Sequence, residues 1–147
     1  MAAVIARGDL NVAADRALGH YTHEKSSVGS AAAIATLDVI EEEGLVQRAR
    51  DLGAHALQRL DNALGEMSLV HQVRGLGLQL AIELRRDGRN ANEDAEAIMY
   101  HSLELGLSYK VSDGNVLSLG PPLTITNAEM DLAIDVLSDA IGNADRR

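Results

Sequence analysis

Two stretches decide the fold: VRGLGLQLAIEL at residues 73–84 and GNVLSLGPPLTIT at residues 114–126. In the first, closely spaced glycines begin an apolar run, a pattern typical of a strand entered through a tight turn. In the second, Asp113 with the following glycine predicts a turn, and Pro121 with its neighbouring proline prevents the sheet from continuing. The pattern between them is helical. We therefore expect the order strand, helix, hairpin, helix in a small α+β domain.

Helical spacing of apolar residues extends to both sides of this core. One long helix is expected from Val28, with Ser26 or Ser27 as its N-cap, and after a break at Gly44 a second covers residues 45–64.

Capping-box patterns open two further helices. Asn90 with Glu93 predicts the start of a helix that ends at Leu105, before a glycine, and Thr126 with Glu129 predicts the start of the last one.

The first 27 residues have a different pattern. Residues 1–6 form a short apolar run that predicts a strand, and a six-residue strand needs partners from a larger sheet. Residues 11–18 predict a short amphipathic helix, and the polar residues 20–27 predict a loop.

Composition limits the class of protein. A chain of 147 residues suits one domain, and the lack of Phe and Trp means that Leu, Ile, Val, Ala and Met must fill the core. A net charge of −9 argues against nucleic acid or an anionic membrane as a partner. There is no cysteine, no apolar run long enough to span a bilayer and no charged start of a signal peptide. We expect a cytoplasmic protein.

The succession of three segments resembles a known family. The two stretches quoted above, together with GHYTHEKSSVGSAAAIATLDVIEEEGL at residues 19–45, are similar to the C-terminal part of class III aminotransferases. These are fold-type I enzymes that use pyridoxal 5'-phosphate. The resemblance runs from about residue 1 to about residue 142, with the segments in the family's order and spacing.

The resemblance implies a fold and a domain organisation. Long helices would pack on a small, mostly antiparallel sheet, as in the family's C-terminal small domain. Residues 1–27 would end the cofactor-binding large domain, residues 28–66 would connect, and residues 67–147 would form the small domain. The intact enzyme would be a homodimer that moves an amino group between an amine or amino acid and an oxo acid.

Thr22 is the residue to which the resemblance gives a cofactor contact. The family carries a threonine five residues before a proline, and this threonine reaches across the dimer to the cofactor phosphate. Counted back from the helix start, Ser27 takes the proline position and Thr22 the threonine position. A hydroxyl suits a phosphate, which accepts several hydrogen bonds. The residues between them differ from the family's usual small polar ones, which changes the loop.

The chain has only two lysines, Lys25 and Lys110. The family's Schiff-base lysine comes shortly before the strand that matches residues 1–6, so it would lie upstream of residue 1, and this chain alone would be an inactive fragment. Lys25 is interpreted as a loop cation or a phosphate neighbour. Lys110 is interpreted as a hairpin-edge residue that discourages further strand pairing.

Ser118 occupies a position where the family often has an arginine, three residues before the two prolines. That arginine grips a substrate carboxylate with a bidentate fork, so carboxylate binding would be weaker here or located elsewhere. Arg74 matches the arginine of the family's RGxG motif, for which a structural role is favoured over substrate contact.

No metal site is expected. His20 and His23 with Glu24 have no third ligand at zinc-like spacing, and the remaining histidines are interpreted as surface or core residues. Two alternative functions stay open beside the aminotransferase. One is a racemase, epimerase or decarboxylase on the same scaffold, and the other is a non-catalytic interaction domain.

Overall fold

The computed structural model describes residues 5–10, 12, 15–16 and 26–146. The chain divides into two compact units, Met1–Gly44 and Leu45–Arg147. The expected strand at residues 1–6, helix at 11–18 and loop at 20–27 lie largely outside the described residues.

The described part of the first unit contains a short 3-10 helix, η1 (Gly8–Leu10), and the helix α1 (Ser27–Glu42). Ser26 is the N-cap of α1, because its Oγ accepts a hydrogen bond from the backbone N–H of Gly29. Ser27 is already helical, so the alternative cap position is wrong.

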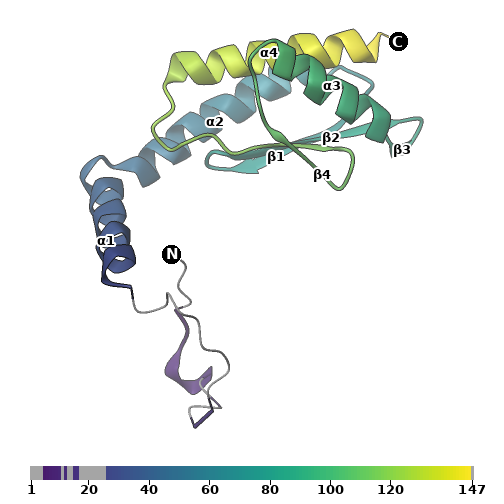
Figure 1. The fold of residues 1–147 in the computed structure, drawn as a ribbon. Coiled ribbons are helices and arrows are strands. Elements are labelled where there is room, and N and C mark those ends of the chain that lie inside the picture. Colours follow the sequence, from purple (N-terminus) through teal and green to yellow (C-terminus); the bar gives the residue numbers. More distant parts are fainter. Residues whose placement is uncertain (1–4, 11, 13–14, 17–25, 147) are drawn as a thin grey trace. The chain divides into compact units, whose positions relative to one another are not determined.

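The second unit follows the order α2 (Leu45–Leu64), β1 (Val70–Leu76), β2 (Gln79–Arg86), β3 (Arg89–Asn90), α3 (Asn92–Glu104), β4 (Lys110–Ser112), β5 (Val116–Leu119) and α4 (Asn127–Asp145). The strands pair antiparallel in the order β1-β2-β5-β4, and β3 pairs with β2. The three helices lie on one side of the sheet (Figure 1). The expected α+β class with a mostly antiparallel sheet is confirmed.

The first of the two deciding stretches contains the tight turn predicted from its glycines, with a strand on each side of it. Leu76 pairs with Gln79, which leaves a two-residue turn between β1 and β2. Gly77 opens this turn with a φ of +55°, the conformation that favours glycine at the first central position of a tight hairpin.

The expected cap of α3 is also wrong, because Asn90 belongs to β3. Ala91 is the N-cap, and no side chain caps the helix. Pairing with β2 takes Asn90 into the sheet, so its side chain does not close the capping box with Glu93. The second box is confirmed: the Thr126 hydroxyl accepts the Glu129 N–H, and the Glu129 carboxylate accepts the Thr126 N–H.

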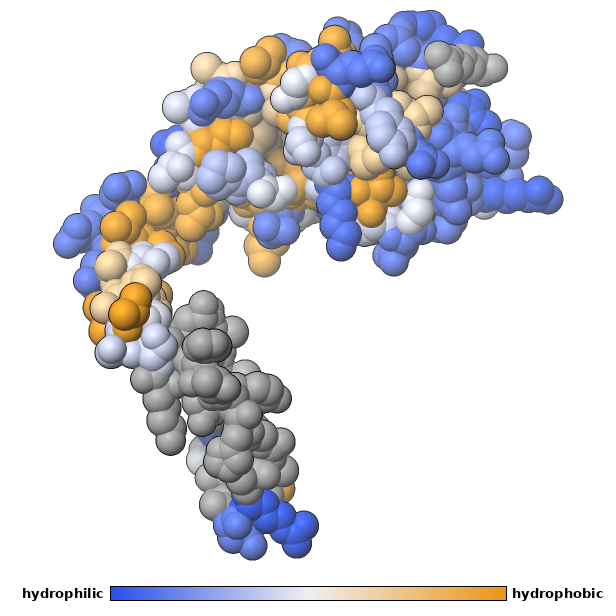
Figure 2. Space-filling view, in the orientation of Figure 1, coloured by the Kyte–Doolittle hydropathy of each residue, from blue (hydrophilic) through white to orange (hydrophobic). Residues whose placement is uncertain are grey.

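The core lies between the sheet and its helices. Alternate residues of β2 are buried, as expected for a strand with one covered face, and one stripe of α2 is buried against them. Figure 2 shows hydrophobic and polar residues interspersed on the outward side of α3 and α4. No helix in the described ranges is both long and apolar enough to cross a membrane. The fully buried large side chains are Leu60, Leu64, Leu69, Ile82, Leu84, Ile98, Leu117, Ile134, Leu137 and Ile141.

The end of α4 is fastened by a carboxylate. Asp145 accepts hydrogen bonds from the Leu69 N–H at 2.7 Å and from the Ser68 hydroxyl at 2.8 Å. Desolvation raises the pKa of Asp145, but these hydrogen bonds outweigh it and the pKa is lowered overall. Because the charged form is favoured, this contact holds the helix to the loop before β1.

The helix α2 approaches the β1–β2 turn so closely that a side chain does not fit between them. A Cβ at Gly53 would lie 2.1 Å from the carbonyl oxygen of Gly77. Backbone cannot move aside as a flexible side chain can, so glycine at position 53 is a packing requirement.

We expect Gly53→Ala to lower the free energy of unfolding by about 1–3 kcal/mol, because the helix must move away from the turn. Gly142→Ala is the matched control, since a Cβ there would meet Met67 at an ordinary 3.4 Å. As a helical Gly→Ala change with space, it should be neutral or stabilising by up to about 1 kcal/mol. Urea unfolding measures both, and equal effects would contradict the packing argument.

Candidate functional site

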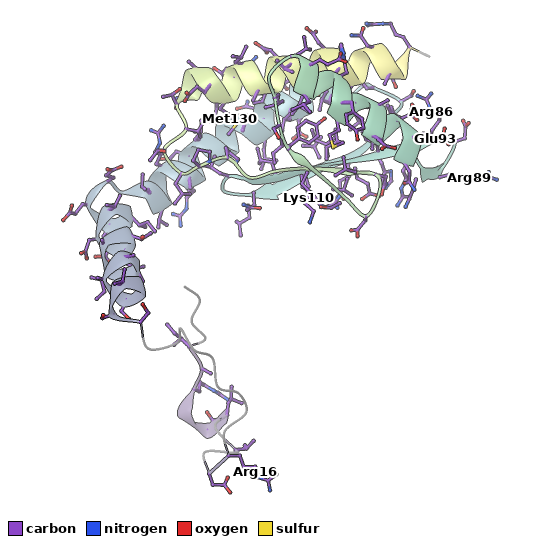
Figure 3. The ribbon with its side chains drawn as sticks, in the orientation of Figure 1. Arg16, Arg86, Arg89, Glu93, Lys110 and Met130 are labelled. Carbon is purple, nitrogen blue, oxygen red and sulfur yellow. The ribbon has the colours of Figure 1, made fainter. Side chains whose placement is uncertain are left out.

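The sheet has one face that no helix of its unit covers, here called the open face. Register places Arg74, Ala81, Ser118 and Lys110 in one row across β1, β2, β5 and β4. We call these four residues the open-face row. In Figure 3 Lys110 lies on the side of the sheet away from α4, whereas Met130 lies on the α4 side. Cations therefore stand at both ends of the row, with two small residues between them.

Arg74 is held by neighbours on the open face. Its guanidinium donates to Gln72 at 3.0 Å and to Glu83 at 2.9 Å, and Arg85 donates to the same carboxylate at 2.9 Å. Desolvation raises the pKa of Glu83, but the hydrogen bonds from the two arginines lower it overall. These contacts fit the structural role expected of Arg74.

Two serines form a hydroxyl pair at the other end of the open face. The Ser118 hydroxyl donates to the Ser112 hydroxyl at 3.0 Å, and Ser118 is directly opposite Lys110 in the β4–β5 register. Lys110 is exposed and occupies the edge strand, as expected. It forms no ion pair with any residue that the structure describes.

A cleft of about 530 Å³ lies next to these residues. Ser118, Lys110 and Gln79 contribute to its lining together with apolar residues of α4 and of the segment before β4. Polar groups and an apolar wall thus meet at one place, which is the usual composition of a small-molecule site.

Asn115 determines which residues meet across the β4–β5 hairpin. Asn115 is 3% exposed, and its side-chain amide donates to the Leu84 carbonyl at 2.8 Å. The backbone carbonyl of Asn115 accepts the Leu84 N–H at 2.9 Å. Ser112 pairs with Val116, so the turn consists of the three residues 113–115 and includes the asparagine. This register puts Lys110 opposite Ser118.

Several other candidate residues lie in the part of the chain that the structure does not describe. Thr22 and Lys25 lie outside the described residues, as do His20, His23 and Glu24. Among the residues that are described, no group of three or more His, Asp or Glu could hold a metal ion.

The remaining histidines lie on the surface. His55 is bonded to Asp131 at 2.8 Å, His101 lies 3.6 Å from Glu104, and His71 is exposed on β1.

The described residues do not form a complete site for pyridoxal phosphate. Their one lysine, Lys110, is exposed on an edge strand, and no described carboxylate pairs with it. We therefore assign no cofactor contact to the described residues.

Sequence reasoning missed the grouping of Lys110, Ser112 and Ser118. The sequence gives Lys110 and Ser118 separate interpretations and Ser112 none. The alternation of Lys110 and Ser112 before the Asp-Gly turn indicates that both face one side of the sheet, but the loop length that brings Ser118 opposite is not visible in the turn dipeptide.

Comparison with known proteins shows the family. The model for "Aminotransferase class-III" matches residues 2–141. The chain belongs to the class III aminotransferase family.

Members of this family with several activities are similar to the chain. An (R)-1-hydroxy-2-aminoethylphosphonate ammonia-lyase of Vibrio splendidus is 42% identical over 96% of the chain and 30% of its own length. A leucine/methionine racemase of Thermococcus litoralis is 37% identical over 87% of the chain and 30% of its own length.

A solved transaminase structure from an ancestral-reconstruction study superimposes with a TM-score of 0.80 at 32% identity, covering 88% of the chain and 30% of that protein. The chain thus spans about 30% of the length of these class III relatives. The fold is that of the C-terminal domain expected from the sequence.

We expect Asn115→Ala to lower the free energy of unfolding by about 1–2 kcal/mol, because a buried hydrogen bond is lost. Asn115→Asp keeps the shape but replaces the donor with a buried carboxylate facing a carbonyl, so the loss should be larger. Acidification protonates the new carboxyl, restores a donor and should recover part of this loss. Urea unfolding measures the effects, with the exposed Asn90→Ala as the control. An Asn115→Asp variant as stable as the parent would contradict this role.

Proposed function

We propose that this chain is the C-terminal part of a pyridoxal-phosphate-dependent enzyme that moves an amino group between an amine or amino acid and an oxo acid. The observation that carries the proposal is the family match over residues 2–141, together with the similarity of the fold to a transaminase. The chain would supply the wall of the substrate pocket formed by the open face and the cleft beside it.

A second candidate function changes the reaction and keeps the cofactor. Ser118 stands where an arginine would grip a carboxylate, and a serine cannot form a bidentate charged contact. Two relatives, at 42% and 37% identity, are an ammonia-lyase and a racemase. Elimination, racemisation, epimerisation or decarboxylation is therefore the alternative to transfer.

The finer features of the enzyme are part of the same proposal. Residues 1–27 would end the large domain, residues 28–66 would connect, and residues 67–147 would form the small domain. The Schiff-base lysine would lie upstream, so the 147-residue chain alone would be inactive, and the intact enzyme would be a cytoplasmic homodimer. The position of the lysine is compatible with the relatives, since the chain spans about 30% of their length.

The function is tested in the intact enzyme with a ¹⁵N-labelled amine or amino acid and an unlabelled oxo acid. Transfer gives a new ¹⁵N-labelled amino acid, and elimination gives labelled ammonia. Racemisation or epimerisation inverts a centre of the donor without moving the label, and decarboxylation releases CO2 and leaves the label on the product amine. We expect labelled amino acid as the main product. Release of ammonia alone, or inversion alone, would replace the first candidate by the second, and no reaction with any cofactor-loaded preparation would refute both.

We propose Thr22 as a phosphate contact of the cofactor. Removing one hydrogen bond to a charged phosphate costs about 1.5–3 kcal/mol, so Thr22→Ala in the intact enzyme should weaken cofactor affinity roughly 10-fold to 150-fold. Equilibrium dialysis against pyridoxal phosphate measures it, and Thr22→Ser, which keeps the hydroxyl, is the control. Unchanged affinity in Thr22→Ala would show that the loop is aligned wrongly.

A further inference from the structure

Lys110 is a cation on the open face that none of the contacts described above involves. Lys110 projects from the edge strand on the side away from the helices (Figure 3). The ion pairs of the open face go to Glu83, which binds Arg74 and Arg85. The Glu83 carboxylate is thus engaged by the two arginines and not by Lys110. An ammonium that forms no ion pair with the described residues is available to an anion.

The hydroxyl pair beside Lys110 supplies a second donor. Ser118 donates to Ser112 at 3.0 Å, which leaves the Ser112 proton free for another acceptor. If the two hydroxyls rotate, Ser112 donates and the Ser118 proton is free instead. In either arrangement the pair offers one O–H, and the alternation of β4 puts it on the same face as Lys110.

Only small residues lie between these donors, so a ligand can approach the sheet there. Ala81 and Ser118 are adjacent in the open-face row, and Gly120 continues β5 beyond it. A Cβ at Gly120 would lie 3.0 Å from Nε2 of Gln79, so the amide of Gln79 lies over the glycine. The small residues form a floor, with Lys110 on one side and the amide of Gln79 near the other.

We propose that Lys110, with the Ser112–Ser118 hydroxyl pair, binds a tetrahedral oxyanion, the phosphonate or phosphate monoester of a small substrate. An arginine fork matches the two coplanar oxygens of a carboxylate, whereas a lysine acts as a point charge. A lysine with separate hydroxyl and amide donors suits oxygens that point in several directions. As a substrate contact, this inference rests on the proposed function, and the apolar cleft would take the rest of the molecule.

The binding step is tested without turnover, on the whole 147-residue chain. Methylphosphonate, methyl phosphate and acetate are titrated separately at mildly alkaline pH while backbone amide ¹H–¹⁵N shifts are recorded. We expect saturable shifts confined to β4, β5 and Ala81, with both phosphorus oxyanions bound more tightly than acetate. The tighter of the two identifies the source. Because no amino-group chemistry is involved, failure here leaves the proposed function standing, and failure of the ¹⁵N transfer experiment leaves the anion site standing.

Amino-acid substitutions test which side chains bind the anion. Lys110→Gln should weaken methylphosphonate binding at least about 10-fold, as expected for loss of a charge-assisted hydrogen bond. The double change Ser112→Ala with Ser118→Ala should also weaken methylphosphonate binding, although the charge of Lys110 is kept. The matched control is Arg89→Gln, which removes one exposed positive charge from β3 at another end of the sheet and should leave affinity unchanged. Equal weakening by Arg89→Gln, acetate binding as tight as methylphosphonate, or shifts outside the open face would overturn the proposal.

Discussion

The amide of Asn115 is the contact on which both faces of the sheet depend. By donating to the Leu84 carbonyl while its backbone accepts the Leu84 N–H, it fixes β5 against β2 and makes the β4–β5 loop three residues long. A shift of one residue would exchange the two faces of a strand. The buried asparagine therefore aligns Leu117 and Leu119 with the core, and in the same step it brings Ser118 opposite Lys110 on the open face.

Much of the fold could be predicted from local patterns. The second long helix, the Thr126–Glu129 capping box and the end of β5 before the prolines are properties of neighbouring residues, and the structure has each of them. The tight turn that enters β2 was predicted from its closely spaced glycines, whereas the length of β1 before it depends on pairing with β2. The cap at Asn90 was not predicted correctly because pairing with β2, a contact between strands, overrode the local helix signal.

The candidate site was less predictable than the fold. Its residue types are visible in the sequence, and the family resemblance implies an arginine position at Ser118. Their grouping depends on register: a two-residue turn at Asp113 would pair Lys110 with Leu117, whereas the three-residue loop pairs it with Ser118. This difference of one residue is decided by the buried hydrogen bonds of Asn115, and these form only once β2 is in place.

The division between the two faces lets stability and binding vary separately. On the covered face, volume is fixed: Gly53 cannot gain a methyl group, and fully buried leucines fill the space beneath the helices. On the open face, Ala81, Ser118 and Lys110 are not constrained by packing against a helix, so their charge and size can change at little cost to folding. The residues of the open face can therefore change without disturbing the packing of the covered face. A substitution at Ser118 would change the shape or charge of this surface, while the strand that carries it would stay in register.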